Sequence, residues 1–537
     1  MSFGFEVRIE TDIDNMANFE TTTLGGSKRV MQDPPYAAML RQAVQSHRAG
    51  RLQEAERLYR QVLAENPQQP DAHHNLGAVL ARHGRLTEAL PHLKAGVEGR
   101  PEESKYWSAC IQVMQALGAR EDLAELYRKL TTLQPGLAAA HYNLANALKD
   151  LGRWDEAADS YRTALKLNPG LAAAHNNLGN VSKLQGKLDD ADAGYRAAIA
   201  ADPDFAEAHC NLGNVLEQRG HLDAAEACYR RVLALTPDHI EVNRHLGAVL
   251  MEQGRTADGL DAFMRYAQRK YGGGTPPAPT SASSHKSKHD AEQRAWLGNE
   301  NISTDTFRLE GGARVGGGAI NRDNDAAAIC TAWRVNKPQI VVIDNLLTQE
   351  ALTALRRMCH GSTFWRNSFP NGYLGAVPQD GFAAPLLAQI SEELAAVYSE
   401  IFEGHPLLQL WAFKYDSSLK GINLHADFAA VNVNFWITPE SANRDPEHGG
   451  LIIWDKAAPL DWDFAKYNND EAAMRNFLRT AGAQAITVPY RANRAVIFDS
   501  DLFHETDQIQ FREGYENRRV NVTFLYGWRA SGRGNRA

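Results

Sequence analysis

The sequence lacks three features that would place it in common classes of protein. Basic residues are not in excess, because 57 Lys and Arg stand against 65 Asp and Glu, giving a net charge of -8. Such a chain is not expected to bind nucleic acid non-specifically. No apolar run is long enough to span a bilayer, and the opening MSFGFEVRIETDID carries acids where a signal peptide needs apolar residues. We therefore expect a soluble, cytoplasmic protein with neither a membrane nor a nucleic acid as partner.

Cysteine is also scarce, and its spacing is uninformative. The five cysteines are scattered without any CxxC pair, at Cys110, Cys210, Cys228, Cys330 and Cys359. This pattern argues against a disulfide framework and favours reduced thiols inside a cytoplasmic protein. The chain has 537 residues, which is too long for a single hydrophobic core, so two or more domains are expected.

A regular period runs through the first half of the chain. Glycines recur every 34 residues, at Gly50, Gly84, Gly118, Gly152, Gly186, Gly220 and Gly254. Prolines keep the same 34-residue step, at Pro67, Pro101, Pro135, Pro169, Pro203 and Pro237. Two residue types that hold one period over more than 200 residues indicate internal repeats.

Each repeat is predicted to be a pair of helices. In AAHYNLANALKDLGRWDEAADSYRTALKLNP, apolar and small residues recur at three- and four-residue spacing, and Gly152 lies at the turn between the halves. The period, the NLG, the Gly followed by an EA pair and the closing Pro resemble the tetratricopeptide repeat. Seven such repeats cover 36–271. The resemblance implies an all-α superhelix that is stable by stacking and offers a concave surface to a protein or peptide.

Asparagine recurs at one position of the repeats. In one interpretation it is merely tolerated near a helix start. In the other it forms a ladder on the concave face, resembling the repeats of O-GlcNAc transferase, where such amides hold the backbone of a bound polypeptide. The histidines two positions earlier (His73, His141, His175 and His209) are interpreted as consensus packing and not as metal ligands. The peptide-binding candidates are Asn75, Asn143, Asn177 and Asn211.

The composition changes after the repeats. Residues 272–290, GGGTPPAPTSASSHKSKHD, are rich in Gly, Pro and Ser and are predicted to be a flexible linker. An irregular lead-in follows to 335, and tails are expected at 1–35 and 531–537. From 336 to 530 a strand and an amphipathic helix precede short, β-branched and aromatic runs, which predict a mainly β domain. Two stretches of this domain, 361–382 and 456–482, are expected to be loops around an acceptor pocket, the second long enough for a lid.

A metal site is predicted within this β domain. The strand-like stretch LHADFAAVNVNFWI, 424–437, carries His425 and Asp427 two positions apart, so a strand would turn both to one side. His504 in AVIFDSDLFHET is the best third ligand. Two histidines and one carboxylate form the facial triad of non-haem Fe(II) oxygenases. The competing interpretation is a polar pair on a sheet face with a loop histidine elsewhere.

A site for an acidic co-substrate is predicted next to the triad. The strand RRVNVTFLY turns Arg519, Asn521 and Thr523 to one face and Arg518 to the other. A guanidinium there suits bidentate binding of a carboxylate, and the hydroxyl of Tyr415 is a candidate donor to the same group. The choice between Arg518 and Arg519 stays open by one residue. Asn432 and Asn434 are weaker pocket candidates, and Gly449 and Gly450 are interpreted as turn residues only.

Together these pieces resemble the 2-oxoglutarate- and Fe(II)-dependent dioxygenases, in the branch similar to prolyl 4-hydroxylases. The matching pieces are VVIDNLLTQEALTAL, Tyr415 before HAD, the GG of HGGLIIWD, His504 and RVN. The resemblance implies a double-stranded β-helix, or jelly roll, with flanking helices. It implies Fe(II) on His425, Asp427 and His504, and 2-oxoglutarate on Arg519 with Tyr415 and Asn521. O2 is the further co-substrate, with ascorbate as an optional addition, and succinate and CO2 are products.

Three functions follow from these observations. The first is an oxygenase that hydroxylates a protein or peptide side chain recruited by the repeats, a tethering hypothesis in which deleting 36–271 spares turnover uncoupled from substrate. The second is a non-catalytic scaffold for protein–protein interaction. The third is a dioxygenase acting on a small molecule or saccharide.

Overall fold

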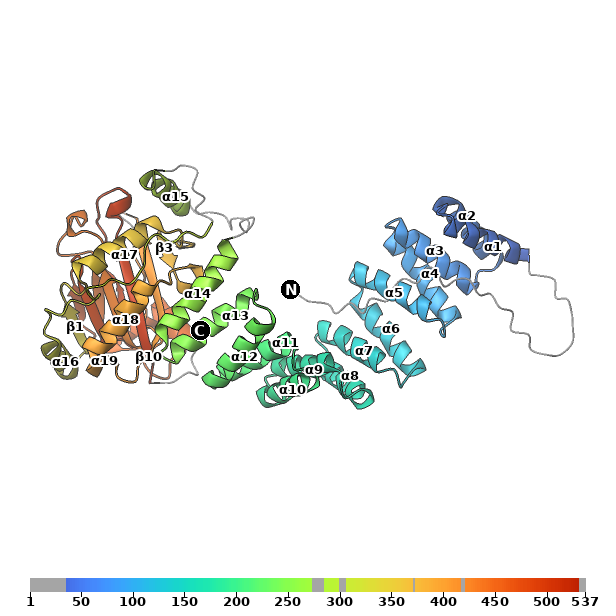
Figure 1. The fold of residues 1–537 in the computed structure, drawn as a ribbon, viewed down its shortest axis with the longest axis horizontal. Coiled ribbons are helices and arrows are strands. Elements are labelled where there is room, and N and C mark those ends of the chain that lie inside the picture. Colours follow the sequence, from blue (N-terminus) through green and yellow to red (C-terminus); the bar gives the residue numbers. More distant parts are fainter. Residues whose placement is uncertain (1–34, 273–283, 299–305, 370–371, 417–420, 531–537) are drawn as a thin grey trace. The chain divides into compact units, whose positions relative to one another are not determined.

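The computed structural model describes residues 35–272, 284–298, 306–369, 372–416 and 421–530 (Figure 1). Residues 1–34 of the predicted tail at 1–35 lie outside this range, as does the predicted tail at 531–537. The described chain forms two compact units, one ending at Arg153 and one beginning at Trp154. The second unit contains the later repeats together with the β domain.

The described residues from 35 to 272 hold seven helix pairs, which confirms the predicted all-α repeat array. The turn within each pair ends at the periodic glycine, and Gly152 and Gly186 have φ of +73° and +75°, a conformation that favours a residue without Cβ. The helices are α1 (Pro35–Arg48), α2 (Leu52–Glu65), α3 (Pro70–Arg82), α4 (Leu86–Gly99), α5 (Ser104–Leu117), α6 (Arg120–Leu133), α7 (Ala138–Asp150), α8 (Trp154–Leu167), α9 (Ala172–Leu184), α10 (Leu188–Ala201), α11 (Ala206–Gln218), α12 (Leu222–Leu235), α13 (Ile240–Glu252) and α14 (Thr256–Tyr271).

The periodic histidines have a structural explanation. The Nε2 atoms of His141, His175 and His209 lie 2.9–3.1 Å from the carbonyl oxygen of the repeat proline six residues earlier. His73 makes the same contact with the carbonyl of Pro67. Each histidine therefore ties the start of its repeat to the preceding turn, in line with the prediction of consensus packing.

The β domain contains two antiparallel sheets. The larger has the order β1-β8-β5-β10-β4-β3-β2 and the smaller the order β7-β6-β9. The strands are β1 (Ile340–Ile343), β2 (Asn367–Phe369), β3 (Tyr373–Ala376), β4 (Leu407–Tyr415), β5 (Ala429–Trp436), β6 (Leu451–Ala457), β7 (Ala485–Val488), β8 (Ala495–Asp499), β9 (Leu502–Thr506) and β10 (Val520–Trp528).

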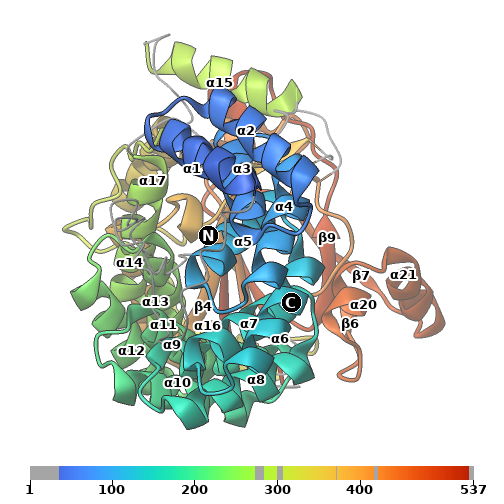
Figure 2. The same ribbon diagram turned by 90° about the vertical axis from the view of Figure 1, so that its right-hand side faces the viewer.

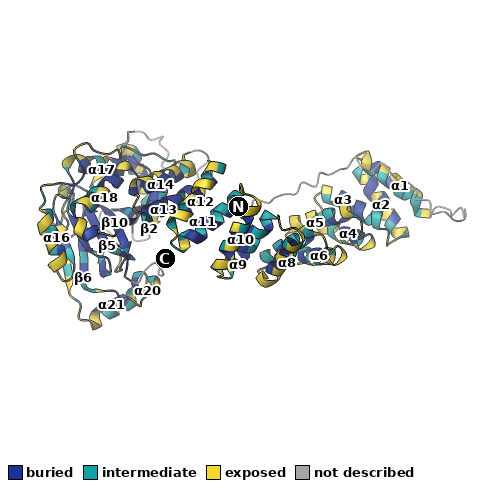
Figure 3. Ribbon diagram, turned by 60° about the horizontal axis from the view of Figure 1, so that its bottom comes forward, coloured by how far each residue is buried: buried dark blue, intermediate teal, exposed yellow. Residues whose placement is uncertain are grey.

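Alternation along the strands separates two faces of the larger sheet. Val433 and Val522 belong to the core beneath α17 (Gln349–Gly361) and α18 (Pro385–Val397), the helices that cross this sheet in Figure 1. Trp436 and Phe498 face the other way and pack with residues of the smaller sheet. Successive side chains point to opposite faces, so the same strands supply a helix-covered core and an inner face toward the second sheet. Figure 3 shows β5 and β10 as buried.

The predicted loop at 456–482 contains two helices. They are α20 (Phe464–Asn468) and α21 (Glu471–Thr480), and Figure 2 shows both beside β6 and β7. Tyr467, Met474 and Leu478 pack on Phe503 of β9. The segment is thus a packed flap over the smaller sheet. Further helices that the sequence did not indicate are α16 (Ala326–Val335) in the predicted irregular lead-in and α19 (Ser399–Phe402).

The seventh repeat is continuous with the β domain. Met251, Leu260 and Phe263 of α13 and α14 are at most 4% exposed and belong to the same core as α17, α18 and the larger sheet. Tyr271, the last residue of α14, donates a hydrogen bond of 2.8 Å to Asp380 of the β domain. The apolar faces of this repeat are therefore buried by the neighbouring domain, which caps the array.

The predicted flexible linker is wrong over its last residues. Residues 273–283 lie outside the described range, but α15 (Ser284–Trp296) is helical. Its His289 is fully buried, and its Gln293 donates to the carbonyl oxygens of His360 and Ser362 at 3.0 and 2.8 Å. Tertiary packing thus orders a segment whose composition alone favours a coil.

A buried lysine lies beneath α15. The ammonium of Lys414 contacts the carbonyl oxygen of Cys359 at 3.0 Å, the Tyr515 hydroxyl at 3.1 Å and Nε2 of His289 at 3.3 Å. It also lies over the rings of Trp365 and Tyr515, at 4.5 and 4.4 Å. These contacts give all three ammonium protons a partner in a site without solvent.

This cluster predicts acid sensitivity of the second unit. Burial, aided by the Lys414 charge, lowers the pKa of His289 and of His360 to about 3. The folded state then binds fewer protons than the unfolded state between pH 3 and 6.5. The free energy of unfolding therefore falls as the pH decreases through that range, by up to about 1.4 kcal/mol per pH unit for each histidine. We expect His289→Gln to flatten the decline of the unfolding free energy between pH 7 and 5, as measured by urea titration. His285→Gln, on the same helix but partly exposed, should leave the slope unchanged, and equal slopes for both variants would contradict this account.

Candidate metal centre and its cavity

The structure brings the three predicted metal ligands together. Donor atoms of His425, Asp427 and His504 lie within 4.8 Å of one another. The two carboxylate oxygens of Asp427 face one histidine each, Oδ1 at 3.9 Å from Nε2 of His425 and Oδ2 at 3.4 Å from Nε2 of His504. This is the only such group of at least three His, Cys, Asp or Glu within the described ranges.

The backbone around His425 differs from the predicted strand. β5 begins only at Ala429, and His425 forms a single antiparallel bridge with His504 of β9. Their backbone hydrogen bonds are 3.0 and 2.8 Å long. The segment 424–428 thus crosses from the smaller sheet to the larger one. The alternation of side chains survives in this extended crossing, and Asp427 faces the same site as His425.

Both imidazoles are held in one tautomer. Nδ1 of His425 lies 2.8 Å from the carbonyl oxygen of Asn423, and Nδ1 of His504 lies 3.0 Å from that of Leu502. A carbonyl only accepts, so each Nδ1 carries the proton and each Nε2 offers a lone pair to the site. Burial, with the nearby His504, lowers the pKa of His425 to about 4, which keeps this ring neutral at physiological pH.

The carboxylate of Asp427 stays ionised and is fixed in direction. Burial acts to raise its pKa, but the neighbouring histidines and the amide of Asn432 hold the pKa below its usual value. Asn432 donates to Oδ2 at 2.6 Å. Two imidazoles and one oriented carboxylate form a donor set that suits Fe(II), so the residues present fit the metal that the resemblance implies.

A chain of amides leads from Asp427 along the inner face. Asn434 donates to Asn432 at 2.5 Å, and Asn521 and Thr523 of β10 each donate to Oδ1 of Asn434 at 2.8 Å. These weaker sequence candidates therefore lie on the cavity wall, as Asn521 does. Because every member has a partner, the row is rigid and orients the Asp427 side chain.

Arg519 lines the same cavity and points one nitrogen into it. Its Nε donates to the carbonyl oxygen of Gly449 at 2.7 Å and its Nη2 to that of Gly450 at 3.1 Å. Its Nη1 is buried without a hydrogen-bond partner among the described residues, and so is the hydroxyl of Tyr415, whose ring lies 4.8 Å below the guanidinium. A buried guanidinium and a hydroxyl side by side in the cavity wall suit a carboxylate ligand.

Arg518 lies outside this cavity. Its Nε donates to Glu292 of α15 at 2.8 Å, and its Nη1 is 3.7 Å from Asp416. The extended backbone leading into β10 therefore turns the two neighbouring arginines to opposite sides, as the sequence pattern predicted for Arg519.

The two glycines have a larger role than the sequence suggested. Gly449 has φ of +87°. A Cβ on Gly450 would lie 1.9 Å from the carbonyl oxygen of Val488, so only glycine lets these strands approach. Both carbonyls then reach Arg519 and fix its guanidinium. The GG pair alone could not have revealed this, because the partner lies 70 residues away in the sequence.

The cavity that joins these groups has a volume of about 490 Å³. Its inner part holds the triad, the amide row, Tyr415 and Arg519. Its other part is neutral and partly aromatic, with Asn367, Phe369, Gln409, Trp411, Phe428, Phe464 and Asn469 from β2, β4, the crossing segment and the flap. The predicted acceptor loops at 361–382 and 456–482 thus both contribute to its lining.

The asparagines of the repeats are divided between the two units. Asn75 and Asn143 belong to the first, and Asn177 and Asn211 to the second. Asn75 is buried and the other three are half-buried. Asn211 donates to Asn176 at 2.9 Å, so this amide is engaged within the array. Their binding of a peptide stays a prediction.

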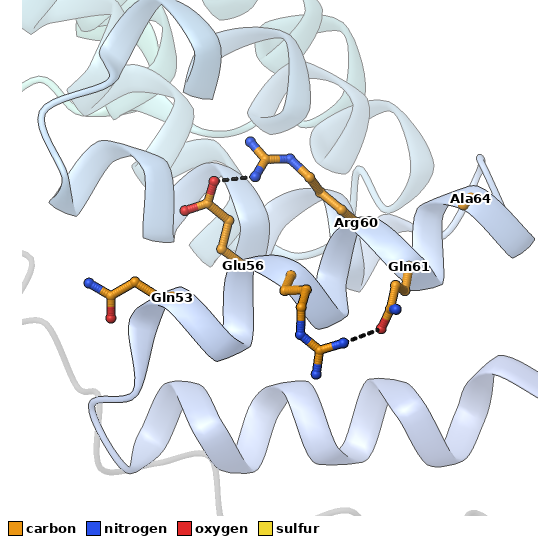
Figure 4. Close-up of a pocket in the computed structure, with 6 residues that line it drawn as sticks. Gln53, Glu56, Arg60, Gln61 and Ala64 are labelled. Carbon is orange, nitrogen blue, oxygen red and sulfur yellow. Dashed lines mark hydrogen bonds and ion pairs between the residues drawn. The ribbon is translucent and has the colours of Figure 1, made fainter.

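A second hollow lies on the first unit, along α2 (Figure 4). It is lined by residues of this helix alone, among them Glu56, Arg57, Arg60 and Gln61. Glu56 pairs with Arg60, and Arg57 donates to Gln61 at 3.1 Å. These are i,i+4 pairs within one helix, in which the buried Glu56 and the exposed Arg57 already have partners, so we assign no ligand to this hollow.

Comparisons with known proteins address the repeats. Residues 47–112 match a tetratricopeptide repeat family model, 145–186 and 180–220 match a second model described as TPR repeat, and 206–239 match a third. The chain carries tetratricopeptide repeats. Their presence confirms the repeat prediction for this part of the chain. No curated protein matches the chain.

Solved tetratricopeptide repeat structures resemble part of the chain at low identity. YrrB, described as having an unusual peptide-binding site, is 20% identical with a TM-score of 0.29, over 34% of this chain and 95% of its own. A repeat protein from Parabacteroides merdae is 18% identical with a TM-score of 0.31, over 44% and 93%. The C-terminal part of one from Cytophaga hutchinsonii is 10% identical with a TM-score of 0.35, over 42% and 93%. Among the described residues, no helix is long and apolar enough to cross a membrane.

Proposed function

We propose that the protein is a 2-oxoglutarate- and Fe(II)-dependent dioxygenase that hydroxylates a side chain of a protein or peptide recruited by the tetratricopeptide repeats. One observation carries the proposal. The compact His425, Asp427 and His504 group lines the same cavity as the buried Arg519, whose Nη1 has no hydrogen-bond partner among the described residues. Two antiparallel sheets around this cavity support the jelly-roll interpretation of the domain.

The residues divide the work as follows. His425, Asp427 and His504 would hold Fe(II) on one side, and Arg519 with Tyr415 would hold the distal carboxylate of 2-oxoglutarate. When bound, Fe(II), 2-oxoglutarate and O2 supply the oxidation, in which 2-oxoglutarate becomes succinate and CO2 and one oxygen atom enters a C–H bond of the substrate. The amide row keeps Asp427 oriented, and Gly449 and Gly450 keep the guanidinium in place.

An anaerobic titration of the metal-free protein with Fe(II) and 2-oxoglutarate tests the proposal. The expected result is a visible charge-transfer band from the chelate. A folded protein without this band would contradict the assignment.

The neighbouring arginines provide a matched pair for the same titration. Arg519→Ala should weaken 2-oxoglutarate binding by roughly 10- to 100-fold, because it removes a charge-assisted, buried contact. Arg518→Ala should leave the affinity within about twofold, since this side chain binds Glu292 instead. Equal losses in both variants would show that the choice of Arg519 is wrong.

A scaffold for protein–protein interaction is the second candidate function. The matches to tetratricopeptide repeat families favour it directly. In this case the β domain would bind neither Fe(II) nor 2-oxoglutarate, which the titration detects. A dioxygenase acting on a small molecule would form the same chelate of Fe(II) and 2-oxoglutarate. It would differ only in that a small molecule, and not a peptide, stimulates succinate formation.

A further inference from the structure

A chain of hydrogen bonds runs from the last repeat helix into the cavity. Tyr271, at the end of α14, donates through its hydroxyl to Oδ1 of Asp380 at 2.8 Å. Oδ2 of the same carboxylate accepts from Nδ2 of Asn367 at 2.8 Å. Asn367 begins β2 and lines the cavity. A residue of the repeats is thus two hydrogen bonds away from the cavity wall.

Asp380, which joins Tyr271 to Asn367, is held in place by packing, and so is the Tyr271 ring. Asp380 is 8% exposed and ends a short 3-10 turn, Pro378–Asp380, against which α14 packs. The guanidinium of Arg366, next to Asn367 in sequence, lies 3.8 Å over the ring of Tyr271. The Tyr271 side chain therefore contacts Arg366, which precedes Asn367 in the sequence, and Asp380, which binds the Asn367 amide. The position of Tyr271 is thus coupled to that of β2.

This arrangement decides how Asn367 presents its amide. A carboxylate only accepts hydrogen bonds, so the NH2 group of Asn367 must face Asp380. The carbonyl oxygen Oδ1 is then left to accept a hydrogen bond from a ligand. An asparagine without such a partner would rotate and offer either group, whereas this one offers an acceptor only.

The sheet register shows how far Asn367 lies from Asn521, which belongs to the inner part of the cavity. Asn367 pairs with Gly375, Gly375 with Phe413, and Phe413 with Asn521. Three strand spacings of about 4.8 Å separate Asn367 from Asn521, roughly 14 Å. Gly375 has no side chain in this row, and the rings of Phe369 and Phe413 lie over it. At this separation Asn367 is suited to the chain beside the reacting residue and not to the reacting carbon itself.

The remaining wall of this part is uncharged over the described residues. Phe369, Trp411 and Phe464 supply aromatic surface, and the exposed Gln409 and Asn469 supply amides. Aromatic rings and carboxamides suit peptide groups and neutral side chains. Over the described residues this wall offers no charged group that could pair with a charged side chain of a substrate.

We infer that this end of the cavity binds an uncharged stretch of polypeptide next to the hydroxylated residue. In this site Oδ1 of Asn367 accepts a backbone N–H, and the seventh repeat acts through Tyr271 and Asp380 to position that acceptor. The inference rests on the proposed function. It makes the last repeat part of the substrate site in addition to any recruiting role.

The test uses the full chain with Fe(II), 2-oxoglutarate and O2 and three pools of synthetic 15-residue peptides, one neutral, one with acidic and one with basic residues. Succinate release and a 16-Da mass gain of the peptides are measured. The neutral pool is expected to react with a kcat/KM at least about tenfold above the charged pools. Tyr271→Phe should raise KM for this pool about fivefold with kcat within twofold, the effect of losing one positioning hydrogen bond. Asn367→Ala should raise KM at least as much.

Tyr266→Phe is the matched control, because this tyrosine lies on the same helix and its hydroxyl faces Glu241 within the repeats. It should leave KM and kcat unchanged. Equal use of charged pools, an unchanged KM in a folded Tyr271→Phe variant, or no oxidised peptide despite a normal chelate band would each overturn the inference and leave the proposed function standing. Absence of the chelate band would overturn both.

Discussion

Replacing Asp427 by Ala is expected to abolish succinate formation, with a loss of at least about 100-fold. The substitution removes the only carboxylate of the triad and leaves two imidazoles. Changes to groups that merely orient a metal ligand already cost 10- to 100-fold in affinity or activity, so loss of the ligand itself should cost more. The check is succinate release with Fe(II) and 2-oxoglutarate, alongside the chelate band.

A matched variant separates loss of the metal from loss of the fold. Asp461→Ala removes an exposed carboxylate from the segment before the flap helices and should leave succinate formation unchanged. Asp427→Ala also leaves the amide of Asn432 without its acceptor, which we expect to lower stability by about 1–3 kcal/mol. Normal turnover in a folded Asp427→Ala protein would show that the triad is not the working site.

The second large effect concerns where the repeats are cut. A chain beginning at 272 is expected not to fold to a stable β domain, whereas a chain beginning at 154 should retain its unfolding midpoint and the chelate band. Met251, Leu260 and Phe263 are buried in the core of the β domain. Their removal forfeits about 1.5–3 kcal/mol each, roughly 5–9 kcal/mol together, which approaches the entire stability of a typical domain.

This expectation replaces the one drawn from the sequence, in which deletion of 36–271 spares uncoupled turnover. The two truncations are compared by thermal unfolding and by the titration with Fe(II) and 2-oxoglutarate. If the chain beginning at 272 unfolded at the same temperature as the full chain, the shared core would contribute little, and the flexible tether would be the better description.

The candidate site was largely predictable from local pattern. His425, Asp427 and His504 were selected by spacing on extended segments, and all three meet in one cavity. The choice of Arg519 over Arg518 depended on strand alternation, and the structure places only Arg519 in the cavity. Period-two alternation is a property of extended backbone, so it holds even where His425 lies on a single bridge and not in a regular strand.

The prediction of a flexible linker was wrong at α15 because that helix depends on distant contacts and not on local pattern. The stretch SSHKSKHD has no apolar period, and its composition predicts a coil. His289 and Gln293 of α15 are nonetheless buried, because Lys414, Tyr515 and the carbonyls after α17 provide partners from more than 60 residues away in the sequence. Local propensity is a weak prior that such contacts override.

The sequence by itself determined the repeat period, the alternation of the strands and the residue types of the candidate metal site, because each depends on neighbours within one helix or strand. Only the tertiary structure decided that the seventh repeat shares the core of the β domain. It also decided that Gly449 and Gly450 hold Arg519, and that Tyr271 reaches Asn367 through Asp380. Those contacts join residues distant in the chain, and their energy comes from burial and paired polar groups that exist only after the chain has folded.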